Sequence, residues 1–243
     1  MKAFWCGREL HNFGDALTPY LIEKITGEQP EYDGLRDERH YFVTGSILHE
    51  TKKNTVILGA GFMSQASYLR ELPLETHLVR GHITKEMLKK QGIECNNVGD
   101  PALALPHLYD PGVERQQLLG VVPHYEDFAI ASKFHRGPVN LLDPIEEVIK
   151  RICIFKYILS SSLHGLIVAH AFNIPALWVE FSDRLGGDGM KFYDYFSSVG
   201  ITPYKPVNCR DFIPGHIIDI IPKDTGDKKI QSNVLNILRE NLK

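Results

Sequence analysis

The sequence lacks any long hydrophobic run. No stretch approaches the roughly 20 apolar residues that a membrane helix needs. Residues 1–7 hold no long apolar run either, so we expect no signal peptide. Lysine and arginine are scattered, and the formal net charge is -3. This charge pattern gives no electrostatic case for nucleic acid and argues against a basic membrane-binding patch.

Cysteine is scarce and widely spaced. The four cysteines, Cys6, Cys95, Cys153 and Cys209, include no CxxC pair, so we expect neither a zinc site nor any other metal site. Widely spaced cysteines indicate free thiols in a reducing compartment rather than a framework of disulfides. We therefore expect a cytoplasmic protein. The chain also lacks internal repeats and low-complexity segments.

The 243 residues alternate between strand-like and helix-like patterns, which predicts an α/β fold. Tyr109-Asp-Pro-Gly-Val113 is Pro/Gly punctuation and indicates a domain boundary. We therefore predict two α/β domains, residues 1–110 and 111–243, and the last helix is free to pack back on the first domain. The predicted strands include 2–6, 40–46, 55–62, 75–80, 118–125, 139–143 and 176–179. The predicted helices include 16–26, 85–91, 144–151, 165–172, 191–196 and 228–242.

The stretch 157–178 indicates a strand, a Ser-rich turn, a helix and a further strand. Ser160, Ser161 and Ser162 are candidate N-caps, and His164 falls in the first turn of the helix. Free N–H groups and the positive helix end would make this turn an anion site at the carboxyl edge of a parallel sheet. The alternative is that the serines only cap the helix and His164 only packs.

Other polar residues follow predicted strands. Asn12 and Asp15 place an amide and a carboxylate beside a glycine at a predicted strand-to-helix turn. The alternative is that they only cap the helix. Arg80 ends the strand 75–80, where it is either an anion-binding fork or a structural ion pair; we favour the fork. His124 ends the strand 118–125.

Two further patterns have a structural and a functional interpretation. Gly59-Ala-Gly61 resembles half of a dinucleotide fingerprint, but the third glycine is missing, so we expect no such cofactor. The aromatic-rich helix 191–196, which holds Lys191 and Tyr195, suggests a sugar-stacking wall; packing against the core is the commoner role of such a helix.

An ordered set of motifs carries a resemblance to a known family. Together these motifs resemble the polysaccharide pyruvyl transferase family, especially the short exopolysaccharide ketal pyruvate transferases of xanthan- and succinoglycan-type pathways. The motifs are Asn12-Phe-Gly-Asp15, Gly45-Ser46, Leu58-Gly-Ala-Gly61, Val79-Arg-Gly-His-Ile-Thr84, Gly99-Asp-Pro-Ala102, Pro123-His-Tyr125 and Ser160-Ser-Ser-Leu-His-Gly165.

The resemblance implies two Rossmann-like domains that face each other across a cleft, as in GT-B glycosyltransferases. It implies phosphoenolpyruvate as donor and a sugar, often lipid-linked, as acceptor, so membrane contact is at most peripheral. The first domain would take the acceptor and the second the donor. No other cofactor is expected. The oligomeric state is left open.

The resemblance also implies roles for single residues. The family histidine maps onto His164, and the family arginine onto Arg80, with Arg136 as a rival. The expected donor residues are Arg80, Arg136, Ser160, Ser161, Ser162, Leu163 and His164. The expected acceptor residues are Asn12, Asp15, Lys191 and Tyr195.

Ketal formation needs a proton donor for the methylene carbon of phosphoenolpyruvate and a base for the sugar hydroxyls. His164 is the candidate acid, His124 the alternative acid and Asp15 the candidate base. A nucleotide-sugar glycosyltransferase and a non-catalytic glycan-binding scaffold are the alternative functions.

Overall fold

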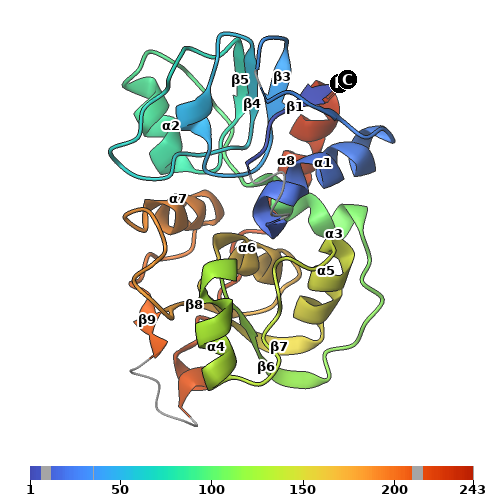
Figure 1. Ribbon diagram of the computed structural model, residues 1–243, viewed down its shortest axis with the longest axis vertical. Coiled ribbons are helices and arrows are strands. Elements are labelled where there is room, and N and C mark those ends of the chain that lie inside the picture. Colours follow the sequence, from blue (N-terminus) through green and yellow to red (C-terminus); the bar gives the residue numbers. More distant parts are fainter. Residues whose placement is uncertain (7–11, 35, 210–215, 243) are drawn as a thin grey trace.

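The computed structural model describes residues 1–6, 12–34, 36–209 and 216–242. Within these residues the strands form two separate parallel sheets, with the orders β2-β1-β3-β4-β5 and β6-β7-β8-β9. Figure 1 shows the sheets toward opposite ends of an elongated molecule, with helices between them. The predicted α/β class with parallel sheets is confirmed.

The first sheet is built from short strands. They are β1 (Lys2–Ala3), β2 (Glu31–Tyr32), β3 (His40–Phe42), β4 (Thr55–Leu58) and β5 (Glu75–Leu78). Its helical neighbours include α1 (Phe13–Thr26), α2 (His82–Lys89) and α8 (Lys229–Asn241). Helix α1 buries Leu17, Leu21 and Ile22 at helical spacing, which explains why this segment folds as a helix on the sheet.

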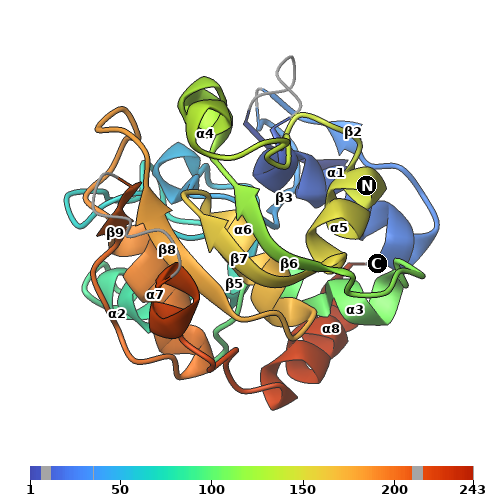
Figure 2. The ribbon, with the colours of Figure 1, turned by 90° about the horizontal axis from the view of Figure 1, so that it is seen from below.

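The second sheet follows the same strand–helix alternation. Its strands are β6 (Gln117–Val122), β7 (Phe155–Ser160), β8 (Ala176–Glu180) and β9 (Val207–Asn208). The helices of this part are α4 (Phe128–Phe134), α5 (Ile145–Cys153), α6 (Leu163–Ala171) and α7 (Met190–Val199). Figure 2 shows β6, β7 and β8 side by side, with α4 at one end of the sheet.

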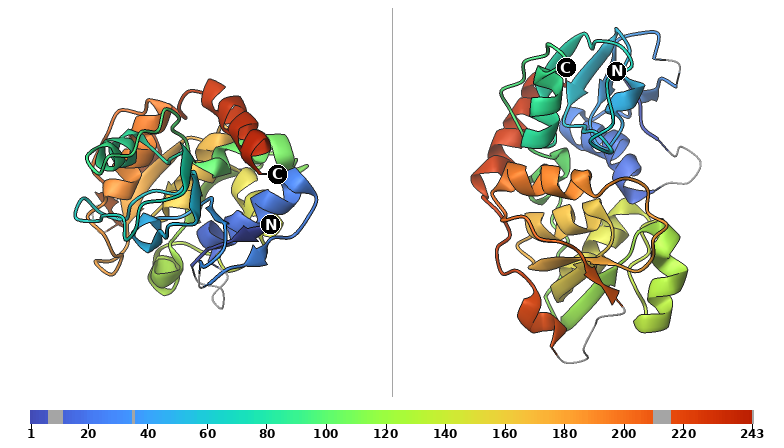
Figure 3. Two further views of the ribbon diagram at one scale, coloured as in Figure 1. Left: turned by 90° about the horizontal axis from the view of Figure 1, so that it is seen from above. Right: turned by 90° about the vertical axis from the view of Figure 1, so that its left-hand side faces the viewer.

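Short helical segments complete the described fold. They are η1 (Leu48–Glu50), η2 (Pro101–Ala104), α3 (Leu105–Leu108), η3 (Tyr125–Asp127) and η5 (Ile217–Ile220). The chain passes from the first sheet to the second through η2 and α3, and the domain boundary at residue 110 stays a prediction. Helix α8, near the C-terminus, packs back on the first part of the chain, where it contacts β5, α1 and η2. In Figure 3 it runs along the flank of the part that holds both termini.

Helix α6 is buried on nearly every side. It contacts β7, β8, α5 and α7 as well as η2, and Leu166, Ile167 and Val168 are fully buried. A helix that is apolar all round must be covered all round. This position places the first turn of α6 at the junction between the two sheets.

One predicted strand is wrong. Residues 139–143 form a turn, in which the side-chain amide of Asn140 donates to Asp143 Oδ1 at 2.8 Å. The Val139 amide donates to the Val121 carbonyl of β6 at 2.8 Å, and the segment does not continue this pairing as a strand. Asparagine and aspartate bond to nearby groups and thereby favour turns over strand ladders.

Among the described residues, no helix combines the length and apolar character needed to cross a membrane.

Candidate active site

A cavity of about 380 Å³ opens between the parts of the molecule that hold the two sheets. Its wall takes residues from α1 and the loops after β3 and β4, and from the turns after β6 and β7 together with α7. The predicted site residues on this wall are Asn12, Asp15, His124, Ser162, Leu163, His164 and Lys191. The structure thus brings seven of the predicted residues, from widely separated parts of the chain, around one space.

The start of α1 forms one side of the cavity. Asn12 is the N-cap residue, and its Nδ2 donates to Asp15 Oδ2 at 2.9 Å. Gly14 has no side chain, and a Cβ there would lie 2.2 Å from His164 Nδ1. The glycine of this motif therefore allows the His164 ring to approach the helix start. Burial raises the pKa of Asp15, and the Asn12 bond and His164 act against that rise.

His164 lies opposite, in the first turn of α6. Its side chain is 12% exposed, and Nε2 is 3.8 Å from Asp100 Oδ2. Neither of these two atoms has a hydrogen-bond partner among the described residues. Burial lowers the pKa of His164 to about 4, so the imidazole of the unliganded protein is neutral at pH 7.

Lys191, near the start of α7, supplies positive charge. Of the described residues on the cavity wall, it is the one lysine or arginine. Burial lowers its pKa to about 8, and Arg80 acts in the same direction while Glu126 and Asp15 oppose it. The ammonium group therefore stays mostly protonated at pH 7 and begins to lose its charge one pH unit higher.

His124 follows β6 on the same wall. Its Nδ1 accepts a hydrogen bond from the Glu126 amide at 3.4 Å, and its ring packs on Tyr125 with centroids 4.4 Å apart. Burial lowers the pKa of His124, and Lys191 adds to the effect. Because Nδ1 is an acceptor, neutral His124 carries its proton on Nε2.

Ser160 and Ser161 do not line the cavity, which corrects their assignment to the donor. Ser160 Oγ donates to the Val122 carbonyl at 2.6 Å and accepts from the Ser162 amide at 3.1 Å. Ser161 Oγ donates to Asp127 at 2.7 Å and accepts from the His124 amide at 3.0 Å. Both hydroxyls are buried and hold the turn after β6 against the turn after β7, which positions His124 and His164.

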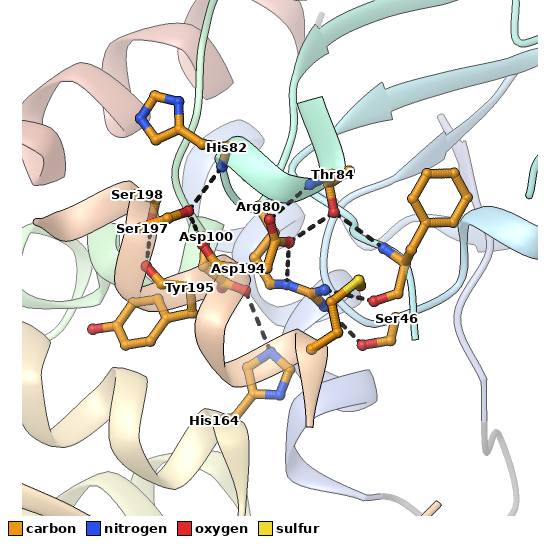
Figure 4. Close-up of polar contacts among 12 residues, drawn as sticks. Ser46, Arg80, His82, Thr84, Asp100, His164, Asp194, Tyr195, Ser197 and Ser198 are labelled. Atoms are coloured by element: carbon orange, nitrogen blue, oxygen red, sulfur yellow. Dashed lines mark hydrogen bonds and ion pairs between the residues drawn. The ribbon is translucent and has the colours of Figure 1, made fainter. Parts of the chain in front are cut away.

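Arg80 is buried behind the wall, which corrects the predicted anion fork. Its Nε donates to Asp194 Oδ2 at 3.0 Å, Nη1 to Ser46 Oγ at 2.7 Å and Nη2 to the Phe62 carbonyl at 2.6 Å. Only 1% of its side chain is exposed. Asp194 also accepts from the amide and hydroxyl of Thr84, at 2.8 and 2.7 Å. Figure 4 shows this network between α7 and the start of α2.

Arg80 still acts on the cavity through its charge. Ser46, to which it donates, is part of the wall. After burial, which is the largest cause, the positive charge of Arg80 contributes to the lowered pKa of both Lys191 and His164. The carboxylate of Asp194, 3.0 Å from Arg80 Nε, offsets this charge, so Lys191 is the main cation that an anion in the described cavity would meet.

Two other predicted residues lie elsewhere. Tyr195 is fully buried and its hydroxyl is 3.1 Å from His170 Nδ1, so it packs in the core instead of binding an acceptor. Arg136 is exposed just after α4 and is not among the residues that line the cavity. The stacking wall also proves to be core, because Phe192 stacks on buried Trp178 with centroids 4.0 Å apart.

Sequence reasoning assigned no role to Asp100, Tyr125 or Glu126. Tyr125 and Glu126 line the cavity directly after His124. Asp100 is 1% exposed and caps η2, its Oδ1 accepting from the Ala102 amide at 3.0 Å. Burial raises its pKa to about 6. The Gly-Asp-Pro-Ala motif was the available signal, but an aspartate before a proline also reads as an ordinary cap.

Metal ligands do not cluster in the part of the chain that the structure describes: no group of three or more His, Cys, Asp or Glu side chains is arranged to hold an ion.

Comparison with known proteins agrees with the motif order. The sequence model of the family described as "Polysaccharide pyruvyl transferase" matches residues 12–183. An uncharacterized protein, L143, of Acanthamoeba polyphaga mimivirus is 30% identical over 94% of this chain and 89% of its own length. The succinoglycan biosynthesis protein ExoV of Rhizobium meliloti is 26% identical over 85% of this chain and 67% of its own. No solved structure matches the chain.

The matched region holds every cavity residue contributed by α1, by the turns after β6 and β7, and by the loops after β3 and β4. It covers well over half of the chain, and the resemblance read from the motifs is confirmed. The protein belongs to the polysaccharide pyruvyl transferase family.

Proposed function

We propose that the protein uses phosphoenolpyruvate to place a pyruvate ketal on a sugar of an exopolysaccharide or cell-surface glycan precursor. One observation carries the proposal: a single cavity joins Lys191, Asp15 and two neutral histidines, His124 and His164. We further propose that the two sheets belong to Rossmann-like domains arranged as in GT-B enzymes. Action in the cytoplasm, on a soluble or lipid-linked acceptor and without a further cofactor, is part of the same proposal.

The donor is an anion with a carboxylate and a phosphate. Lys191 is a cation on the wall, and the buried ion pair of Arg80 and Asp194 lies behind it. The first amides of α6 have no partner within the helix, and Ser162, Leu163 and His164 at this helix start belong to the cavity wall. These groups together favour a small, multiply charged anion.

Ketal transfer is then a balanced sequence of proton movements. A proton adds to the methylene carbon of the donor, and positive charge develops at its C2. One sugar hydroxyl adds at C2, the C2–O bond to phosphate breaks, and a second hydroxyl closes the ketal. The hydroxyls release two protons; one replaces the proton used at the methylene carbon and the other leaves with phosphate.

The wall residues suit these steps. We assign the acid to His164, because a bound phosphate and carboxylate would raise the pKa of an imidazole that burial alone holds near 4. His124, with its proton on Nε2, is the alternative acid or a donor to the phosphate. Asp15 is the base that takes a hydroxyl proton, and its Asn12 bond orients the carboxylate.

A donor screen tests the proposal. The purified protein is incubated with oligosaccharide acceptors and either phosphoenolpyruvate or nucleotide sugars, and released phosphate and nucleotide are measured. We expect acceptor-dependent phosphate release, together with a new ketal methyl signal in the proton NMR spectrum of the product. Nucleotide release would favour a glycosyltransferase instead. Glycan binding without turnover of either donor would favour a scaffold.

A further inference from the structure

Two buried polar atoms, one of Asp100 and one of His164, face each other behind the cavity. Asp100 Oδ2 and His164 Nε2 are 3.8 Å apart, and neither has a hydrogen-bond partner among the described residues (Figure 4). Buried polar atoms are nearly always paired, so an unpaired carboxylate oxygen aimed at an unpaired imidazole nitrogen needs an explanation. Catalytic hydrogen bonds are often long in unliganded proteins and tighten when substrate binds.

The two ring nitrogens of His164 have different surroundings. Nε2 points to Asp100, whereas Nδ1 lies beside Gly14, next to Asp15 on the cavity wall. A carboxylate that accepts a hydrogen bond from Nε2–H fixes the neutral tautomer in which Nδ1 has the lone pair. It also stabilises the imidazolium that forms when Nδ1 takes up a proton.

We propose that Asp100 is a positioning residue for His164. Its carboxylate accepts a hydrogen bond from Nε2–H of His164, so that Nδ1 is the atom that exchanges protons with substrate. The inference rests on the proposed function, in which His164 is the acid. Asp100 itself touches no substrate, because it is 1% exposed and does not line the cavity.

Several charged groups share this environment. Asp15 on α1, Lys191 on α7, Arg80 before α2 and His124 before η3 face His164, while Arg80 and Asp194 face Asp100. The pKa of Asp100, which burial raises to about 6, means that its carboxylate is ionised at neutral pH and protonated below pH 6. A protonated Asp100 no longer accepts from Nε2, so transfer should decline as the pH falls through about 6.

The competing role is purely structural. Asp100 caps η2 through Oδ1, and asparagine caps equally well. Asp100→Asn therefore keeps the cap and the side-chain shape while it removes the carboxylate. Its amide group donates toward Nε2, which favours the tautomer with the proton on Nδ1.

The first experiment measures the tautomer and needs no substrate. Long-range ¹H–¹⁵N NMR of the wild-type protein and of Asp100→Asn at pH 7.5 reports which ring nitrogen is protonated, with His164→Gln used to assign the signals. We expect Nε2–H in the wild type and a change toward Nδ1–H in the variant. The same tautomer in both proteins, with Asp100→Asn folded by circular dichroism, would overturn the proposal.

The second experiment measures turnover. We expect Asp100→Asn to lower kcat for pyruvyl transfer roughly 10²–10⁴-fold with little change in KM, and to remove the fall in rate near pH 6. A structural cap would leave both kcat and the pH profile unchanged. If the wild type does not transfer pyruvate at all, the proposed function fails, and the tautomer measurement still decides the role of Asp100.

Discussion

Two strand-to-helix turns of this protein look alike in the sequence and differ in the structure. Arg80 lies in the turn after β5, and His164 lies just beyond the turn after β7, in the first turn of α6. In the first, Asp194, Ser46 and a backbone carbonyl occupy the guanidinium. In the second, Nε2 of the imidazole has no hydrogen bond among the described residues and the ring reaches a cavity.

The difference separates stabilising from reactive polar groups. A fully paired buried network fixes one arrangement of the chain, as Arg80, Thr84 and Asp194 do between α2 and α7. A polar group left with spare bonding capacity beside a cavity keeps that capacity for a ligand or for proton transfer. We therefore expect substitutions at the first turn to change stability, and substitutions at the second to change activity.

The largest effect is expected at His164. His164→Gln should reduce pyruvyl transfer roughly 10²–10⁴-fold, because the variant keeps much of the side-chain volume but cannot exchange a proton near neutral pH. Thermal unfolding should change little, since glutamine fills much of the same space and His164 Nε2 has no hydrogen bond among the described residues to lose. The checks are phosphate release with a purified acceptor and a melting curve. Near-normal turnover in a folded variant would remove His164 from the chemistry.

Arg80→Ala should mainly destabilise the fold. Removing the guanidinium leaves the carboxylate of Asp194 buried without its charge partner, and such a loss typically costs about 3–5 kcal/mol. Urea unfolding measures the difference. As a matched control, Arg80→Met combined with Asp194→Asn should recover part of the stability, because no unpaired charge then remains and the asparagine oxygen can still accept from Thr84. A fully stable Arg80→Ala variant with a raised KM for phosphoenolpyruvate would instead support the prediction that Arg80 binds the donor anion.

Asp100→Asn should raise the free energy of unfolding even though it lowers the rate of pyruvyl transfer. The pKa of Asp100 is about 6 in the folded protein, above the roughly 3.9 of an unfolded aspartate. Its contribution to stability is therefore fully present below pH 4 and is lost as the pH rises through 6. Asparagine escapes this loss, so the variant should match the wild type near pH 4 and gain up to about 3 kcal/mol at pH 8.

Chemical unfolding of both proteins across this pH range provides the measurement. His164, whose pKa is lowered to about 4, acts in the opposite direction, because its contribution is lost as the pH falls from about 6.5 through 4. It is present in both proteins and largely cancels in the comparison. A variant less stable than the wild type at pH 8 would show that the carboxylate is a net stabilising group.

The next effect concerns donor binding. Lys191→Met should raise the KM for phosphoenolpyruvate roughly 10-fold, the scale of about 1.5 kcal/mol lost with one charge-assisted contact. Because the pKa of Lys191 is about 8, wild-type affinity should also weaken as the pH rises above 8 and the ammonium loses its proton. Lys191→Arg should keep binding strong at pH 9. Equal donor affinity in all three proteins would exclude Lys191 as an anion ligand.

The sequence predicted the local parts of this site better than the distant ones. Strand β7 and helix α6 follow from patterns within a single segment of the sequence. Asp15 and His164 follow strands of different sheets, and only the family resemblance placed them in one site. The burial of Arg80 does not follow, because its partner Asp194 is 114 residues away. The burial of Tyr195 likewise depends on His170, which belongs to another helix.

Serine gave the least reliable signal. The three adjacent serines at the end of β7 suit caps and an anion-binding turn equally well, and of the three Ser162 is the one that lines the cavity. The hydroxyls of Ser160 and Ser161 are taken up by Val122 and Asp127 from the neighbouring turn. Which hydroxyl faces a ligand depends on these contacts across the sheet, and a single sequence does not specify them.

The smallest effect is expected at Arg136, the rival donor arginine. It is exposed just after α4 and does not line the cavity, so Arg136→Ala should leave the KM for phosphoenolpyruvate within about twofold. Unfolding free energy should change by less than about 0.5 kcal/mol, as is usual for surface substitutions. Initial rates at varied donor concentration provide the check, with Lys191→Met as the positive control. A KM raised as far as in that control would mean that the segment after α4 moves onto the donor, and the contrast between paired and unpaired turns would no longer locate the whole anion site.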